Sequence, residues 1–217
     1  MIKLIFLFMI LLLLSSCSFK ATPNKWQYDS SNAFDSYTKN FLSSNDTLAQ
    51  ENLDMAIKHA KKSADLTTLA RIYLGECALN ISVGLKDECN SYLSIADLVD
   101  DKRVDAYYHF ITLQLDKLYI EHLSKNYKLF AMHLSKKEFI KAQHELLNIS
   151  KDTSKLVAAS LIKDSLDSKT REEMIKVASF NGYKKSVIFW LNESKINSTD
   201  KNERRKIAKK ISILKSN

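Results

Sequence analysis

Glycine and proline are nearly absent from this chain, and their scarcity constrains the fold more than any other feature. The 217 residues include three Gly and one Pro. Sheets and tight turns use these two residues heavily, whereas either one destabilises the interior of a helix. The apolar fraction of 45% and the charged fraction of 27% are those of an ordinary globular domain. The composition therefore predicts long helices joined by short polar turns.

Apolar residues recur at the spacing of an amphipathic helix along most of the chain. Ser, Thr, Asp and Asn residues precede several of these stretches, as N-cap residues do. Across 104–134 we expect either one long helix or two, and we favour two that meet near 124–126. No alternation long enough for a sheet occurs, so the sequence predicts an all-α fold. The other expected helices cover 34–41, 48–60, 66–81, 85–99, 138–149, 154–166, 169–181, 184–194 and 200–214.

The N-terminus carries a different pattern. A lysine at position 3 is followed by an unbroken apolar run from Leu4 to Leu14. This run is too short to span a bilayer, which needs about 20 residues, but it suits the apolar core of a secretory signal. It ends in Leu14-Ser15-Ser16-Cys17, an aliphatic residue and two small residues before a cysteine. This order resembles the lipobox of bacterial lipoproteins.

The lipobox resemblance implies how the N-terminus is processed. In such lipoproteins the cysteine thiol receives a diacylglycerol, a peptidase cleaves before it, and the new amine is often acylated. For this chain, residues 1–16 would be a cleaved signal peptide and Cys17 the lipid anchor. Such lipid chains hold a protein at a membrane surface. Because Ser18 is not the Asp that marks inner-membrane retention in many lipoproteins, the resemblance favours the periplasmic face of the outer membrane.

The body behind the anchor has a loose internal register. Residues 18–25 are polar and include the proline, so we expect a lipidated tether over 17–25 and one domain over 26–217. Three sets of residues share an interval of five and then four positions: Gly84-Cys89-Leu93, Lys137-Ala142-Leu146 and Gly182-Val187-Leu191. This spacing resembles the second helix of tetratricopeptide repeats, although the usual 34-residue period is not kept. The resemblance implies a right-handed stack of antiparallel helical hairpins, an α-solenoid, whose concave surface binds proteins.

The two remaining cysteines, Cys77 and Cys89, are expected to form a disulfide. Both fall in the apolar stripes of consecutive expected helices, and the midpoint between them is Val83, beside Gly84. In a helical hairpin that turns there, the two cysteines lie level with each other, within the Cα separation that a disulfide needs. Export supplies an oxidising compartment, and the lipid occupies Cys17. The alternative is two buried free thiols that act as small apolar side chains.

The net charge of +8 is concentrated in the C-terminal third of the chain. Residues 151–217 hold 16 Lys and Arg against 8 Asp and Glu, whereas residues 18–100 hold 8 against 11. In the last expected helix, cations surround a narrow apolar stripe; they include Arg204, Arg205, Lys206, Lys209 and Lys210. These side chains either form the solvated face of a capping helix or contact an anionic lipid or wall polymer.

The sequence predicts no catalytic residue, cofactor or metal site. Phosphate-binding loops and nucleophile elbows need clustered glycines, and the three glycines here are isolated. His122, His133 and His144 lie too far apart along a helix to share one metal ion. Nucleic acid is not an expected partner in the cell envelope. We therefore expect a non-enzymatic, membrane-anchored scaffold or adaptor for an envelope protein; the alternative is an accessory lipoprotein with cell-wall hydrolase or lyase activity.

Overall fold

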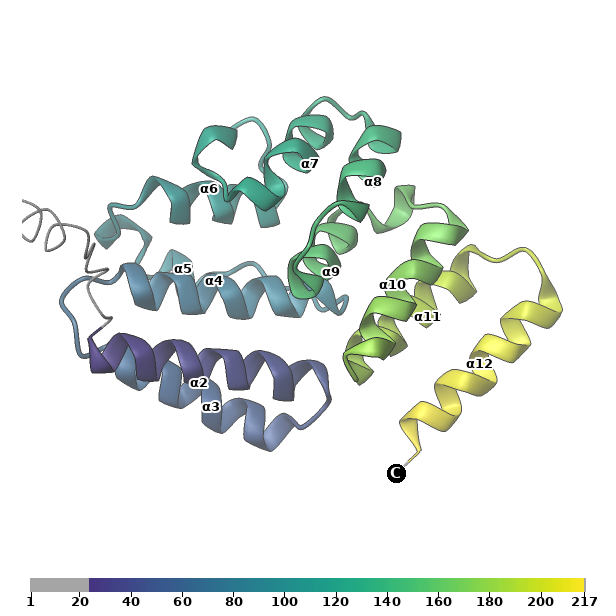
Figure 1. Cartoon of the computed structure of the whole chain (residues 1–217), viewed down its shortest axis with the longest axis horizontal. Helices are drawn as coiled ribbons and strands as arrows, with labels where there is room; N and C mark the ends of the chain where they lie inside the picture. Colours follow the sequence, from purple (N-terminus) through teal and green to yellow (C-terminus); the bar gives the residue numbers. More distant parts are fainter. Residues whose placement is uncertain (1–23, 217) are drawn as a thin grey trace, which may run out of the picture.

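The computed structural model describes residues 24–216, and this part of the chain is built from eleven α-helices and three 3-10 helices, without a β-strand (Figure 1). The prediction of an all-α fold is confirmed, while the expected signal peptide, residues 1–16, and Cys17 lie outside the described residues. The 3-10 helices cover Ala96–Leu98, Ile120–His122 and Lys163–Ser165. The α-helices are α2 (Lys25–Leu42), α3 (Asp46–Ala60), α4 (Thr67–Ser82), α5 (Asn90–Leu93), α6 (Lys102–Ile111), α7 (Lys125–Ser135), α8 (Phe139–Leu147), α9 (Asp152–Leu161), α10 (Ser168–Phe180), α11 (Lys184–Asn197) and α12 (Lys201–Lys215).

Five of the helices end in the same kind of turn, in which one residue takes a left-handed backbone conformation. The N–H of the next residue then donates to the carbonyl five positions earlier, as in a Schellman motif. Glycine is favoured at the left-handed position because it has no Cβ. Three of these turns do without it, so the sequence carried no glycine signal for those helix ends. The left-handed residues are Ser44, Gly84, Leu113, Lys137 and Gly182.

Three of these turns join consecutive helices into hairpins: α2 with α3, α7 with α8, and α10 with α11. Two of the three spaced sets in the sequence, those that begin at Lys137 and Gly182, start at a turn that joins one of these hairpins. The third set starts at the left-handed turn of Gly84, which is not one of the three. The α2–α3 hairpin repeats the same spacing at Ser44, Ala49 and Leu53, and Ala49 and Leu53 are buried. This fourth copy was not recognised in the sequence, and its turn residue, like Lys137, is not a glycine.

The prediction of a helix over 85–99 is wrong. After Gly84 the chain continues without helix to the single turn of α5 and then to a short 3-10 helix. Asp87 interrupts the helix, because its carboxylate accepts hydrogen bonds from the Cys89 N–H at 2.8 Å and from Asn80 Nδ2 at 2.7 Å. Cys89 has a left-handed φ of 57°, which a continuing helix excludes.

The segment 104–134 does contain two helices, but they do not meet. Helix α6 ends at Ile111, and the Gln114 N–H donates to the His109 carbonyl at 2.9 Å around the left-handed Leu113. An irregular stretch with one 3-10 turn follows, and α7 begins at the predicted place, next to Ser124. The other expected helices are present, with α2 starting well before its apolar stripe.

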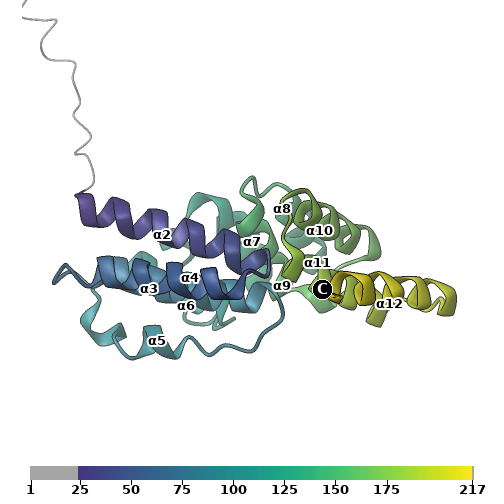
Figure 2. The same ribbon diagram turned by 90° about the horizontal axis from the view of Figure 1, so that it is seen from below.

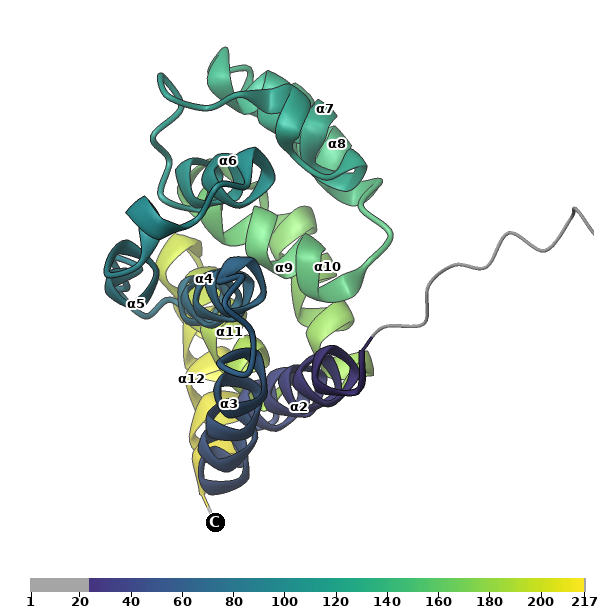
Figure 3. The same ribbon diagram turned by 90° about the vertical axis from the view of Figure 1, so that its left-hand side faces the viewer.

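Helix α4 lies at the centre of the molecule, with parts of the hydrophobic core on two of its faces (Figure 3). Ala70, Leu74 and Ala78 belong to the larger cluster, which includes α6, α7, α8 and α9. Leu69 and Ile72 belong to the cluster with α2 and α3. Because α4 packs beside α9, contacts are not confined to helices that follow each other in the chain.

A second long-range contact holds the N-terminal hairpin against α11. Lys185 of α11 pairs with Asp46 of α3, with Nζ 2.5 Å from Oδ1, and the same Nζ lies 3.9 Å from the centroid of the Phe41 ring. Nearby, Gly84 lies against Phe189, because a Cβ at position 84 would be 2.6 Å from that ring. Glycine is required there both for this close approach and for its φ of 79°.

Substitution of the two left-handed glycines is expected to distinguish two contributions to the free energy of unfolding, the packing against Phe189 and the backbone strain. Gly84→Ala strains the backbone and drives a Cβ into Phe189, so it should lower the free energy of unfolding by about 3 kcal/mol. Gly182→Ala is the matched control, because its φ is 69° but nothing lies within 4 Å of the added Cβ. It should cost about 1 kcal/mol. Urea unfolding followed by circular dichroism measures both losses, and equal losses would contradict the importance of the Phe189 contact.

Candidate binding cleft

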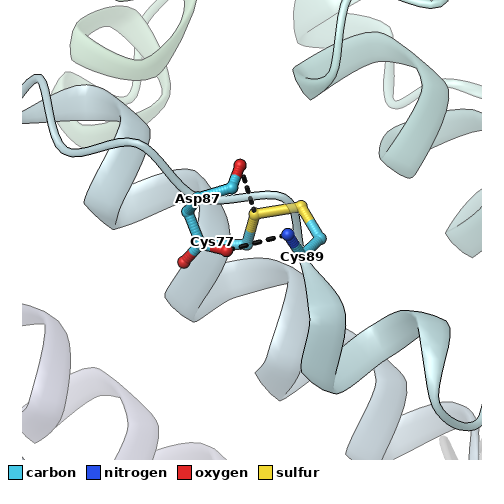
Figure 4. A group of neighbouring side chains, drawn as sticks. All are labelled: Cys77, Asp87 and Cys89. Carbon is cyan, nitrogen blue, oxygen red and sulfur yellow. Dashed lines mark hydrogen bonds between the residues drawn. A yellow bond between two sulfur atoms is a disulfide. The ribbon is translucent and has the colours of Figure 1, made fainter.

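Cys77 and Cys89 form a disulfide with their Cα atoms 5.3 Å apart (Figure 4). Cys77 lies in α4, Cys89 directly precedes α5, and both residues are buried. The chain reverses at Gly84, but Cys89 approaches its partner from an irregular segment rather than from the second long helix that we expected. The bond therefore ties the α4–α5 connection back onto α4.

Asp87 lies beside this disulfide. Its carboxylate and the two sulfur atoms are all within 4.8 Å of one another, a grouping that could hold a metal ion. In the disulfide neither sulfur is a thiolate, and the thiolate is the form that binds metals. Asp87 instead holds the backbone of Cys89 through the hydrogen bond to its N–H (Figure 4). We therefore assign this group a structural role.

The five cations singled out in the sequence lie on α12, which is at the far end of the molecule from the start of α2 (Figure 2). Ile207 and Ile211 are buried against Leu191 of α11, so one side of α12 is apolar. The cations have no ion-pair partner within the part of the chain that the structure describes. The exposed side chains are those of Arg204, Arg205, Lys206, Lys209 and Lys210.

A cleft of about 420 Å³ brings together side chains that are distant in the sequence. Its walls come from α2, α4, α6, α7 and α9 and from the turn between α10 and α11. Aromatic rings and hydrogen-bonding groups share the lining. The aromatic residues are Phe34, Tyr107, Tyr127 and Tyr183, and the polar ones include Asp35, Thr38, Lys39, Lys151, Ser154 and Asn181.

Gly75 positions the Phe34 side of the cleft. A Cβ at position 75 would overlap the ring of Phe34, with Cε1 only 2.8 Å away. Because glycine has no side chain, the Phe34 ring of α2 can lie directly against the backbone of α4. Phe34 remains partly exposed and lines the cleft. Gly75 lies inside α4 rather than at a turn, so this role could not be predicted from the sequence.

Three tyrosines provide neutral hydrogen-bonding groups in the cleft. The rings of Tyr107 and Tyr127 have centroids 5.9 Å apart. Burial raises the pKa of both phenols, and burial together with the nearby Asp152 raises the pKa of Tyr183. Their hydroxyl groups therefore stay protonated at neutral pH. Those of Tyr107 and Tyr127 interact with each other in the buried part of the cleft, whereas the partly exposed Tyr183 can donate to a ligand or accept from it.

The remaining polar lining is partly fixed in place. Asn181 donates from Nδ2 to Asp152 Oδ2 at 2.8 Å, which orients its amide. Asp35, Lys39 and Lys151 are exposed at the rim. Aromatic side chains are enriched at the centre of recognition surfaces, and polar side chains at their rim. The cleft can thus accept apolar side chains of a ligand and hydrogen-bond to its polar groups.

Sequence reasoning did not identify this cleft. Phe34, Tyr107 and Tyr127 lie within helices, and Tyr183 directly precedes α11, so none of them differs from a core residue until the helices are packed. No protein-family model, curated protein or solved structure matches this chain. Among residues 24–216, no helix is long and apolar enough to cross a membrane.

Loss of the disulfide is expected to lower the free energy of unfolding by about 3 kcal/mol, because the bond closes a loop across 12 positions of the unfolded chain. The double variant Cys77→Ala/Cys89→Ala should show this loss in urea unfolding. Reductant should lower the free energy of unfolding of the wild type by the same amount and leave that of the double variant unchanged. Two free thiols from this pair in denatured, unreduced protein would contradict the bond.

Proposed function

We propose that this chain is a membrane-anchored lipoprotein that acts as a non-enzymatic scaffold or adaptor in the bacterial cell envelope. The cleft lined by aromatic and neutral polar side chains is the observation that carries the binding role. The lipobox-like residues Leu14-Ser15-Ser16-Cys17 support cleavage after residue 16 and lipid attachment at Cys17. The partner is an envelope protein, met at the periplasmic face of the outer membrane.

We place the domain among right-handed stacks of antiparallel helical hairpins, similar to tetratricopeptide repeats. The three hairpins with matching left-handed turns support this placement. In a simple solenoid each repeat touches only its neighbours. The contacts of α4 with α9 and of α2 with α11 add packing between distant segments. The proposed stack is therefore short and closed on itself.

An exposed segment of a partner protein is the ligand that suits the cleft. Its volume of about 420 Å³ falls in the range of small-ligand pockets. A cleft of this size holds a few side chains rather than a folded domain. The protonated phenol of Tyr183 can hydrogen-bond to peptide N–H and carbonyl groups. The rim carries one acidic residue, Asp35, and two basic residues, Lys39 and Lys151. These charges can select a segment whose own charges are complementary.

The short tether keeps the cleft near the membrane. Lys25, the first residue of α2, follows Cys17 by only eight positions. Eight residues span at most about 28 Å when fully extended. The start of α2 therefore stays within this distance of a lipid attached at Cys17, and Phe34 and Lys39 of the same helix line the cleft. A partner bound there is held close to the membrane surface.

Cys17→Ala is expected to abolish lipid attachment, because the thiol is the acceptor for diacylglycerol. The variant should incorporate no labelled fatty acid, and it should accumulate either uncleaved or released from the membrane. Metabolic labelling with palmitate and fractionation of the envelope measure both effects. Ser16→Ala is the control, because it keeps a small residue before the cysteine and should leave labelling intact. A labelled Cys17→Ala protein would refute the anchor.

Charge reversal at the rim is expected to weaken partner binding without unfolding the domain. The variant Lys39→Glu/Lys151→Glu changes two exposed side chains of the cleft. Co-purification of envelope proteins after crosslinking should recover the partner about tenfold less well than with the wild type.

The matched control is Lys58→Glu/Lys61→Glu, which makes the same charge change at exposed positions that do not line the cleft. It should recover the partner as the wild type does. Equal recovery with the rim variant, or an equal loss with the control, would contradict binding in the cleft.

A further inference from the structure

A second cavity, of about 490 Å³, lies between α10, α11 and α12. These three helices lie side by side at the C-terminal end of the molecule (Figure 1). The lining includes Ser168 and Lys169, the first two residues of α10. The N-terminus of a helix carries a partial positive charge and unpaired N–H groups, which favour an anion. This position alone does not define a site, but a buried arginine adds to it.

Arg171 lines this cavity and is only 8% exposed. A guanidinium group remains charged at any pH that a protein tolerates, and it has five N–H donors. Its Nη1 donates to the Leu166 carbonyl, while its buried Nε has no hydrogen-bond partner among the described residues. In the same part of the chain, no carboxylate lies within 4.0 Å of the guanidinium.

Asp167 lies close enough to Arg171 for their charges to interact, but its carboxylate is held mainly by other groups. Asp167 is the N-cap of α10, and its carboxylate accepts hydrogen bonds from the Thr170 N–H at 2.7 Å and from Gln143 Nε2 at 2.8 Å. Burial of a charge is unfavourable unless an opposite charge or hydrogen bonds compensate for it. Arg171 therefore has a charged neighbour but no carboxylate paired with it among the described residues, and the cavity has room for an anion that would pair with it.

The other charges of the cavity reinforce this conclusion. Four cations line it, against the two carboxylates of Glu172 and Glu203, and one of the cations, Lys176, has its Nζ 3.9 Å from Glu173 Oε2. Glu203 already accepts a hydrogen bond from Ser198 Oγ at 2.5 Å. Three of the cations come from α10 and one from the basic face of α12. They are Lys169, Arg171, Lys176 and Lys210.

We propose that this cavity binds a phosphate group, with Arg171 as its principal donor and Lys169 and Lys210 as flanking cations. Arginine donates paired hydrogen bonds to two oxygens of one phosphate, and lysine adds point charge. The volume of about 490 Å³ leaves room for a substituent on the phosphate. Two sources fit this chemistry: the headgroup of an anionic phospholipid and a free phosphate compound. The site is independent of the cleft and does not depend on the proposed function.

Thermal unfolding of the full chain in a non-ionic detergent tests the site. Inorganic phosphate should raise the unfolding temperature above that in sodium chloride of equal ionic strength. Arg171→Met should abolish this shift, and Lys210→Met should weaken the affinity for phosphate about tenfold. Lys210 is exposed, so its replacement tests the site even if Arg171→Met does not fold. Arg205→Met is the matched control, because it removes an exposed cation of α12 that does not line the cavity.

Two further ligands separate the sources. Dihexanoyl phosphatidylglycerol below its micelle concentration should compete with phosphate if the site takes a lipid headgroup, and dihexanoyl phosphatidylcholine should not. Competition by neither lipid, with phosphate binding retained, assigns the site to a free phosphate compound. The proposal is overturned if the wild type shows no shift in phosphate, if Lys210→Met binds as well as the wild type, or if Arg205→Met loses binding equally.

Discussion

Burial of α4 on two sides is the constraint on which the rest of the structure depends. The helix contributes small residues where neighbours come close, including Ala70, Gly75 and Ala78. Because these side chains are short, α2 and α9 can both pack near its backbone. The spacing between them then sets the width of the cleft, whose lining comes from both helices. A larger residue at 75 would move Phe34 and with it one wall of the cleft.

The helices that the sequence predicted correctly are those in which the apolar stripe and the capping residues indicate the same bounds. Helix α12 is an example, because Asp200 caps its first turn and Ile207 and Ile211 form its buried stripe. The prediction failed over 85–99, where the apolar spacing was helical but the side chain of Asp87 competes for backbone N–H groups. The end of α6 was missed because leucine, at position 113, adopts a conformation that usually signals glycine or asparagine.

The sites were harder to predict than the helices, because their chemistry depends on packing between distant segments. Cys77 and Cys89 are close in the sequence, so their proximity could be inferred from one turn. The cleft joins Phe34 to Tyr127 across several helices, and no local pattern links them. Arg171 resembles any other helix cation in the sequence. Its burial, and an Nε with no hydrogen-bond partner among the described residues, distinguish it from its neighbours.

The contact between the N-terminal hairpin and α11 also sets the order in which the chain assembles. Asp46 and Lys185 are separated by 139 positions, so they cannot meet until most of the chain has been synthesised. Hairpins of helices form quickly from local contacts, whereas the closure of a long loop slows folding. The disulfide spans only 12 positions and can close far earlier. The first hairpin to emerge, next to the lipid anchor that we propose, is consequently among the last parts to reach its final place.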